Sequence, residues 1–145
     1  MFKHVLVPTD FGPHSARALE FGIEMAKRFG ARLTLLHTYE IPVFAYAGID
    51  YIPEDFSATV DRAAREKLDS TLADVKKQVP DADAVLHKGV PWQQILATAD
   101  EIHSDLVVMG THGRTGLRHV LLGSVAEKVV RLAQVPVMTV HETPR

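Results

Sequence analysis

The chain has 145 residues, of which 46% are hydrophobic and 23% are charged, and its formal net charge is −2 at pH 7. This length fits one domain with a proper core, so residues 1–145 are expected to form a single domain. Acidic and basic residues are interleaved, which argues against a basic face for nucleic acids or anionic membranes. The chain lacks cysteine, which excludes disulfides, and its first apolar stretch, residues 5–7, is far too short for a signal peptide or membrane span. We therefore expect a cytoplasmic protein with no nucleic-acid partner and no membrane insertion.

The first 38 residues predict a strand, a helix and a second strand. The strands are the apolar runs at residues 4–8 and 32–38, and Gly30 offers a stop for the helix between them. The inner face expected for this helix consists of Ala18, Phe21, Met25 and Phe29, widened by Leu19, Ile23 and Ala26.

Residues 39–56 form an unusually long connection. Its aromatic residues are Tyr39, Phe44, Tyr46, Tyr51 and Phe56. Leaving so many rings in water is costly, and long connections in compact domains are usually functional. We expect this segment to form a lid over a site or a contact in a dimer.

The middle of the chain predicts helix, strand, helix. Residues 57–78 have the charged outer positions and apolar spacing of an amphipathic surface helix, residues 82–88 form a strand that Gly89 turns, and Pro91 opens the next helix. The expected inner faces are Val60, Ala64, Leu68, Leu72 and Val75 in the first helix, and Trp92, Ile95, Leu96, Ala99 and Ile102 in the second.

The C-terminal part predicts a strand over residues 105–109, a helix over 124–133 and a strand over 135–140. Strands joined by helix-length crossovers are parallel neighbours, and their helices cover both faces of the sheet. The predicted class is therefore α/β, with an open five-stranded parallel sheet of the Rossmann-like kind.

A glycine-rich loop lies between the last two of these segments. Gly110 and Gly113 are followed after nine residues by Gly123 and Ser124. Glycine permits positive φ and close approach of a ligand, and a helix that begins at Ser124 directs its N–H groups and positive dipole end at an anion. A Walker loop and a G-x-G-x-x-G dinucleotide loop are both absent. The pattern predicts a phosphate cradle outside these two common fingerprints.

A second segment is expected to face this loop. Ligands of open α/β sheets bind beyond the carboxyl ends of the strands at the point where the winding reverses, commonly between the first and fourth strands. The sequence Pro8-Thr9-Asp10 leaves the first strand, and Met109-Gly110 leaves the fourth. A carboxylate and the glycine-rich loop should therefore meet at one crevice.

Four segments of the chain together resemble the universal stress protein family over nearly the whole length. They are residues 5–10 (VLVPTD), 35–37 (LLH), 105–114 (DLVVMGTHGR) and 122–126 (LGSVA). The resemblance implies the sheet order 3-2-1-4-5. Gly110, Gly113, Gly123 and Ser124 reproduce the G-2x-G-9x-G-(S/T) motif of the family's ATP-binding members.

The resemblance also implies a set of residues that bind ATP or another adenine nucleotide. The adenosine half would be held by Pro8, Thr9, Asp10, Thr38 and Met109. The phosphates would be held by Gly110, Gly113, Arg114, Gly123, Ser124 and Val125.

Two of these residues also have structural alternatives. Asp10 could accept hydrogen bonds from ribose hydroxyls or contact Mg²⁺ through water, but it could instead cap the first helix. Ser124 could bind phosphate, and together with Glu127 it also forms the S-x-x-E pattern of a capping box, in which the glutamate folds back onto the cap.

Little in the sequence supports catalysis. His112, Arg114, Arg118 and His119 are candidate partners for a triphosphate, but the histidines lack a compact metal-ligand spacing and no protein metal site is expected. Apart from Asp10, no acidic residue falls in the predicted phosphate loop to activate water, so no catalytic residue is assigned and at most weak ATPase activity is expected. We expect a nucleotide-dependent sensor or interaction module that regulates an unidentified protein in a stress response. A slow ATP hydrolase and a nucleotide-free dimeric scaffold are the alternatives.

The last strand suggests assembly. Residues 135–140 contain no charge, and an apolar strand at a sheet edge is normally paired or covered. Pro136 removes one donor, which an edge tolerates. We expect a homodimer through this strand, as is common in the family, with a folded-back tail at residues 142–145 as the alternative.

Overall fold

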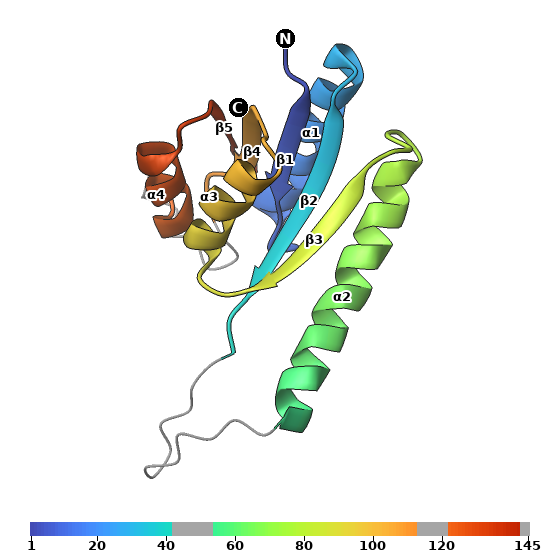
Figure 1. The fold of residues 1–145 in the computed structure, drawn as a ribbon, viewed down its shortest axis with the longest axis vertical. Helices are drawn as coiled ribbons and strands as arrows, with labels where there is room; N and C mark the ends of the chain where they lie inside the picture. The colour runs from blue at the N-terminus through green and yellow to red at the C-terminus, as the bar shows by residue number, and fades with distance from the viewer. Residues whose placement is uncertain (42–53, 113–121, 143–145) are drawn as a thin grey trace.

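The computed structural model describes residues 1–41, 54–112 and 122–142. In chain order the elements are β1 (His4–Pro8), α1 (Pro13–Phe29), β2 (Arg32–Tyr39), α2 (Glu54–Lys76), β3 (Asp83–Lys88), α3 (Pro91–Glu101), β4 (Leu106–Gly110), α4 (Ser124–Leu132) and β5 (Val137–Val140). The strands form one sheet in the order β3-β2-β1-β4-β5, and every neighbouring pair is parallel (Figure 1). The predicted fold class and strand order are both confirmed.

The sheet is the middle layer of three, with a separate apolar cluster on each face. Alternating side chains of a strand point to opposite faces, so Val5 and Val7 of β1 join the cluster under α1 and α2, while Leu6 joins the cluster under α3 and α4. All three side chains are 0% exposed. β1 and its neighbours are therefore buried on both sides, as expected for a parallel sheet.

Local signals explain where the helices begin and end. Pro13 and Pro91 stand in the first turn of α1 and α3, where a missing N–H costs nothing. α1 ends at Gly30, whose φ of 62° is left-handed and whose N–H donates to the carbonyl of Ala26. Pro80 follows the end of α2 by four residues.

The inner face of α1 is confirmed in part: Ala18 and Ala26 are buried, and Leu19, Ile23 and Met25 pack against the core cluster, but Phe21 and Phe29 do not face inward. Its buried residues are the small ones, Ser15, Ala18, Gly22 and Ala26, whereas Phe21 and Phe29 are each 41% exposed. The reason is the close approach of α1 to the sheet, because a Cβ built on Gly22 would lie 2.5 Å from Val7 Cγ2. The rings lie at the flanks instead, where Phe29 packs edge-on against Phe2.

Several element boundaries also differ. α2 spans Glu54–Lys76 rather than 57–78, α4 ends at Leu132, and β5 begins at Val137 because the carbonyl of Pro136 provides the first bond to Val107 N–H. Of the aromatic residues in the long connection, Tyr39 ends β2 and Phe56 lies in α2. The other three, Phe44, Tyr46 and Tyr51, lie outside the described residues.

Candidate functional site

A cavity of about 630 Å³ lies where β1, β2 and β4 end and α4 begins. It is lined by nine of the eleven predicted site residues, namely Pro8, Thr9, Asp10, Thr38, Met109, Gly110, Gly123, Ser124 and Val125. The other two, Gly113 and Arg114, lie outside the described residues. Segments about 100 residues apart thus meet at the switch point between β1 and β4, as the topology requires. Their binding roles remain predictions.

The loop after β1 forms one wall and is held by its own hydrogen bonds. Thr9 N–H donates to the carbonyl of Leu36, the hydroxyl oxygen of Thr9 accepts from Phe11 N–H, and the carbonyl of Thr9 accepts from His37 Nδ1 at 2.7 Å. The same His37 ring contacts Phe11, with 4.4 Å between ring centroids. His37 therefore packs near the carboxyl end of β2 and fixes the loop that carries Asp10.

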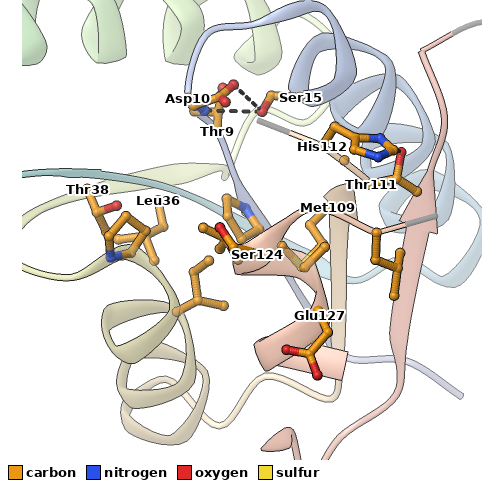
Figure 2. A pocket seen from close by; sticks show the side chains of 18 residues that line it. Thr9, Asp10, Ser15, Leu36, Thr38, Met109, Thr111, His112, Ser124 and Glu127 are labelled. Atoms are coloured by element: carbon orange, nitrogen blue, oxygen red, sulfur yellow. Dashed lines mark hydrogen bonds between the residues drawn. The ribbon is translucent and has the colours of Figure 1, made fainter. Parts of the chain in front are cut away.

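Asp10 does not cap α1, contrary to the alternative considered from the sequence. The cap residue is Gly12, and its N–H donates to Asp10 Oδ1 at 2.8 Å. The same oxygen accepts from the hydroxyl of Ser15 at 2.7 Å, and Ser15 Oγ in turn accepts from Asp10 N–H at 3.1 Å. Figure 2 shows this pair at one end of the cavity. Because Asp10 lies two residues before the cap residue Gly12, its carboxylate belongs to a turn beside the cavity rather than to the helix end.

The first turn of α4 forms the opposite wall. Gly123 is its cap residue, and the first intrahelical bond runs from Glu127 N–H to the carbonyl of Gly123. The N–H groups of Ser124, Val125 and Ala126 precede this bond and have no partner within the helix. All three residues line the cavity, so the positive end of the helix dipole faces it.

The predicted capping box at Ser124 is wrong. Ser124 is the first helical residue, and α4 has no side-chain hydrogen bond at its cap. The carboxylate of Glu127 accepts from Arg131 Nε at 2.9 Å, one turn further along the helix. The pattern fails because an S-x-x-E box requires the serine in the extended cap position, which Gly123 takes with φ −68° and ψ 168°.

Gly110 has a packing role that the sequence did not indicate. A Cβ there would lie 2.7 Å from His14 Cβ and 2.9 Å from the main-chain carbon of His14, so α1 crosses directly over this position. Neither Gly110 nor Gly123 has positive φ. The expectation that these glycines serve a left-handed turn is therefore wrong for both.

The remaining wall is apolar. Leu36, Ile95 and Met109 line it from β2, α3 and β4, together with Pro91 and the methyl-bearing side chain of Thr38. Leu36, Ile95 and Met109 belong to the cluster under α3 and α4. Trp92, which was expected on the inner face of its helix, is half-buried and packs against this cluster. Lys128 Nζ lies 5.4 Å from the centroid of its ring, at the junction of α3 and α4.

Sequence reasoning missed three polar residues that line the cavity as possible site residues, Ser15, Thr111 and Glu127, while His112, a predicted partner for a triphosphate, does line it. Ser15 carried a usable signal, because a hydroxyl in the first helical turn can reach back to a preceding carboxylate. His112 was expected only as a loop partner for phosphate, and Glu127 only as part of a cap. Thr111 carried no signal, because its contacts come from segments about 30 and 100 residues away.

Within the described residues, no group of three or more His, Asp or Glu side chains is arranged to hold a metal ion. No helix in the described ranges is long and apolar enough to cross a membrane.

Known proteins with similar sequences span almost the whole chain. Universal stress protein MJ0531 of Methanocaldococcus jannaschii is 33% identical over 98% of this chain and 84% of its own length. A universal stress protein of Thermus aquaticus, encoded in the 3′ region of a QAH/OAS sulfhydrylase gene, is 36% identical over 97% of this chain and its whole length.

Solved structures have the same fold. Protein MJ0577 of Methanocaldococcus jannaschii superimposes with a TM-score of 0.81 at 26% identity, covering 100% of this chain and 99% of its own. A universal stress protein in complex with cAMP (TM-score 0.72, 24% identity, 98% of each chain) and one from Arabidopsis thaliana with AMP bound (TM-score 0.68, 20% identity, 97% of this chain and 92% of its own) show the same fold. Residues 1–141 match the universal stress protein family itself. The chain belongs to the universal stress protein family.

Proposed function

We propose that this protein binds an adenine nucleotide, ATP in the first place, and acts as a nucleotide-dependent sensor or interaction module in a stress response. The observation that carries the proposal is the convergence of an ordered carboxylate loop and the N-terminal turn of α4 on one cavity. Its volume lies in the range of small-molecule sites, and its walls combine an apolar face with a few polar groups. A cytoplasmic location and a regulated protein partner belong to the same proposal.

The chemistry of the two walls suggests how a nucleotide would lie. The apolar wall of Leu36, Ile95 and Met109 suits a base, and Asp10 suits hydroxyl donors such as those of a ribose. The N–H groups at the start of α4 suit phosphate oxygens. The AMP and cAMP complexes of the two relatives are consistent with an adenine ligand.

Mg²⁺ fits this site only as a companion of the nucleotide. The described residues offer no cluster of three ligating side chains, and Asp10 Oδ1 already accepts two hydrogen bonds. Mg²⁺ is commonly bound through one or two carboxylates together with phosphate oxygens and water. Asp10 would therefore contact the ion through water, and the phosphates would hold it.

The direct test is to denature freshly purified protein and identify any released nucleotide by mass spectrometry. Calorimetric titration of the emptied protein with ATP, ADP, AMP and cAMP, with Mg²⁺ or with EDTA, then ranks the ligands. We expect Asp10→Ala to weaken binding about tenfold or more, because it removes an acceptor and the anchor of the loop. Asp69→Ala, on the exposed face of α2, is the matched control. Wild-type protein that binds none of the four nucleotides would refute the proposal.

Slow ATP hydrolysis is the second candidate. Glu127 lines the cavity together with Asp10, so a second carboxylate is present where the sequence suggested only one. Turnover well above roughly one per minute, lost in Asp10→Ala or Glu127→Gln, would favour the hydrolase, since typical enzymes turn over at about 1–1000 per second. Slower turnover, unaffected by both changes, would support the sensor.

A further inference from the structure

Thr111 is the centre of a polar cluster beside the cavity. Its side-chain oxygen lies 3.1 Å from His112 Nδ1, 3.3 Å from His14 Nδ1 and 3.4 Å from His141 Nδ1. These three rings come from the end of β4, the first turn of α1 and the segment after β5. The carbonyl of Val140, 3.5 Å from the Thr111 hydroxyl, is a further acceptor. Thr111 is only 1% exposed, so its hydroxyl depends on these partners.

The main chain of Thr111 connects two parts of the protein. Its carbonyl accepts from the N–H of Gly123, the cap of α4, at 2.6 Å, and its N–H donates to the carbonyl of Val140 at the end of β5. The position of the α4 N-terminus therefore depends on Thr111. Figure 2 shows Thr111 and His112 together at the side of the cavity away from Thr38.

Counting donors and acceptors assigns the protons in this cluster. The N–H of Glu142 donates to His14 Nδ1 at 3.1 Å, so that nitrogen must be an unprotonated acceptor. Thr111 then contacts His14 favourably only by donating its single hydroxyl proton. The two lone pairs of Thr111 Oγ remain for His112 and His141, which must each carry a proton on Nδ1. In this arrangement the hydroxyl proton goes to His14 Nδ1 at 3.3 Å rather than to the more distant carbonyl of Val140 at 3.5 Å.

A second proton on His14 would break the arrangement. It would place an N–H opposite the N–H of Glu142. The Thr111 hydroxyl would have to turn to the carbonyl of Val140, and three ring N–H groups would then compete for the two lone pairs of Thr111 Oγ. The gain would be an ion pair between His14 Nε2 and the carboxylate of Glu142, 3.5 Å apart, but this carboxylate is 48% exposed, and such pairs contribute little. Among the residues that the structure describes, the other titratable groups that face His14 are His112, whose ring centroid lies 5.2 Å away, and His141, and both keep their Nδ1 protons when they become charged.

We propose that Thr111 is a positioning residue that holds the anion-binding turn of α4 in place, and that it does so only while His14 is neutral. This inference rests on the proposed nucleotide binding and adds a regulation of that same site: affinity falls as pH falls from 8 to 5.5, the interval in which histidines change charge.

The test compares affinities for ATP, ADP, AMP and cAMP at pH 8 and pH 5.5 in wild-type protein, Thr111→Val, Thr111→Ser and His14→Gln. Wild-type affinity should fall about 3- to 10-fold at pH 5.5, the effect of one lost hydrogen bond. Thr111→Val should be weaker by the same factor at pH 8 and lose the further decrease, and Thr111→Ser should restore both features. His14→Gln should keep, at both pH values, an affinity near that of the wild type at pH 8. Protonation of the ligand itself is common to all four proteins and cancels in the comparison.

Two results would overturn the inference alone: equal affinity of Thr111→Val and wild type at both pH values, or an unchanged pH dependence in His14→Gln. If wild-type protein binds none of the four nucleotides, the proposed function fails and this regulation fails with it. A ligand-free measurement separates the two cases. In ¹⁵N NMR spectra at pH 8, His14 should carry its proton on Nε2, and His112 and His141 should carry theirs on Nδ1; a proton on His14 Nδ1 would refute the cluster as described.

Discussion

At the scale of single residues, the carboxylate loop is held by contacts within the protein. Phe11 has a φ of 63°, a left-handed conformation that costs a non-glycine residue on the order of 1 kcal/mol. This turn lets Gly12 N–H reach Asp10 Oδ1, and the Phe11 ring is held against His37. The strain at Phe11 is thus offset by contacts that fix the carboxylate, which lowers the entropy that a ligand would have to remove on binding.

A second polar cluster lies at the opposite, amino-terminal ends of the strands. His4 Nε2 lies 2.7 Å from Thr34 Oγ, and the Thr34 hydroxyl donates to Asp83 Oδ1 at 2.5 Å, so the contacts cross β1, β2 and β3. The N–H of His4 donates to Asp105 Oδ1 at the start of β4. This cluster fixes the register of four strands at the end of the sheet away from the cavity.

The first prediction concerns pH and His4. Burial and the charge of Arg32 lower the pKa of His4 below 6.5, and they outweigh the opposite effects of Asp83, the carbonyl of Ile102 and Asp105. The unfolded chain therefore takes up this proton at a higher pH than the folded protein does. The stability from neutral His4 is complete above about pH 6.5 and is lost as pH falls through the lowered folded pKa.

Urea unfolding of wild-type protein and His4→Gln at several values between pH 5 and 7.5 measures this effect. The free energy of unfolding of the wild type should decrease more steeply toward acid than that of His4→Gln. His87→Gln, at a half-buried position of edge strand β3, is the control and should keep the wild-type slope. Parallel curves for wild type and His4→Gln would contradict the prediction.

At the scale of elements, the site is made by the crossing of α1 over the end of β4. The backbone of His14 lies directly on Gly110, and the same histidine anchors the segment after β5 through Glu142. A helix and two strands therefore meet at a single glycine. Gly110 was expected to let a ligand come close to the backbone. It also has a packing role that does not depend on a ligand.

The second prediction separates these roles. Gly110→Ala should lower the free energy of unfolding of nucleotide-free protein by about 1–3 kcal/mol, because the new Cβ overlaps backbone atoms that cannot rotate away. Gly123→Ala is the control, since its φ of −68° is open to any residue and replacing a glycine helix cap by alanine costs about 0.5–1 kcal/mol. If Gly110→Ala kept full stability and lost only affinity, the glycine would serve the ligand alone.

The third prediction concerns the charge at the start of α4. Ser124→Asp should stabilise the nucleotide-free protein by about 0.3–1 kcal/mol, because a carboxylate interacts favourably with a helix N-terminus. The same carboxylate should weaken nucleotide binding about tenfold or more, because it repels phosphate. Ser124→Asn, similar in size and uncharged, should change both quantities little.

Thermal unfolding and calorimetric titration measure the two effects on the same samples. Opposite signs for stability and affinity are the distinctive result, because general damage to the helix would lower both. If Ser124→Asp bound nucleotide as tightly as Ser124→Asn, the phosphates would have to lie elsewhere in the cavity.

At the scale of the whole molecule, the sheet has two edges, β3 and β5. The carbonyls of Pro136 and Val140 accept from β4, and N–H and C=O groups alternate in direction along a strand, so Thr139 turns its N–H away from the sheet. Val130 and Leu132 of α4, the helix that precedes β5, are each 44% exposed. The homodimer through residues 135–140 remains a prediction. In such a dimer the outward N–H of Thr139 would pair with the partner chain.

The fourth prediction follows from this geometry. Light scattering should give twice the 16.0 kDa of one chain for wild-type protein at micromolar concentration. Thr139→Pro should give the monomer mass, because it removes an outward donor and leaves the bonds between β4 and β5 intact. Thr139→Val keeps the N–H and should remain a dimer. A monomeric wild type would remove this strand as an interface.

Particular positions show which parts of the structure could be predicted from the sequence. Apolar runs and breakers such as Pro13, Gly30 and Pro91 predicted the elements, and the segments shared with the family predicted their order in the sheet. The prediction failed for the inner face of α1, because the distance between a helix and a sheet decides whether phenylalanine or glycine faces inward. It also failed for both caps, because a side chain with capping chemistry caps only if its backbone takes the extended position.

The sequence by itself thus determined the class of fold, the strand order by resemblance, and the set of segments that meet at the cavity. These follow from periodicity, from turn residues and from short motifs, all of which are local. Only the tertiary structure decided that Asp10 is anchored by Ser15, that α1 packs directly on Gly110, and that Thr111 joins three histidines to the cap of α4. Such contacts depend on distances between atoms from segments up to 128 residues apart, and those distances are set by the packing of the whole chain.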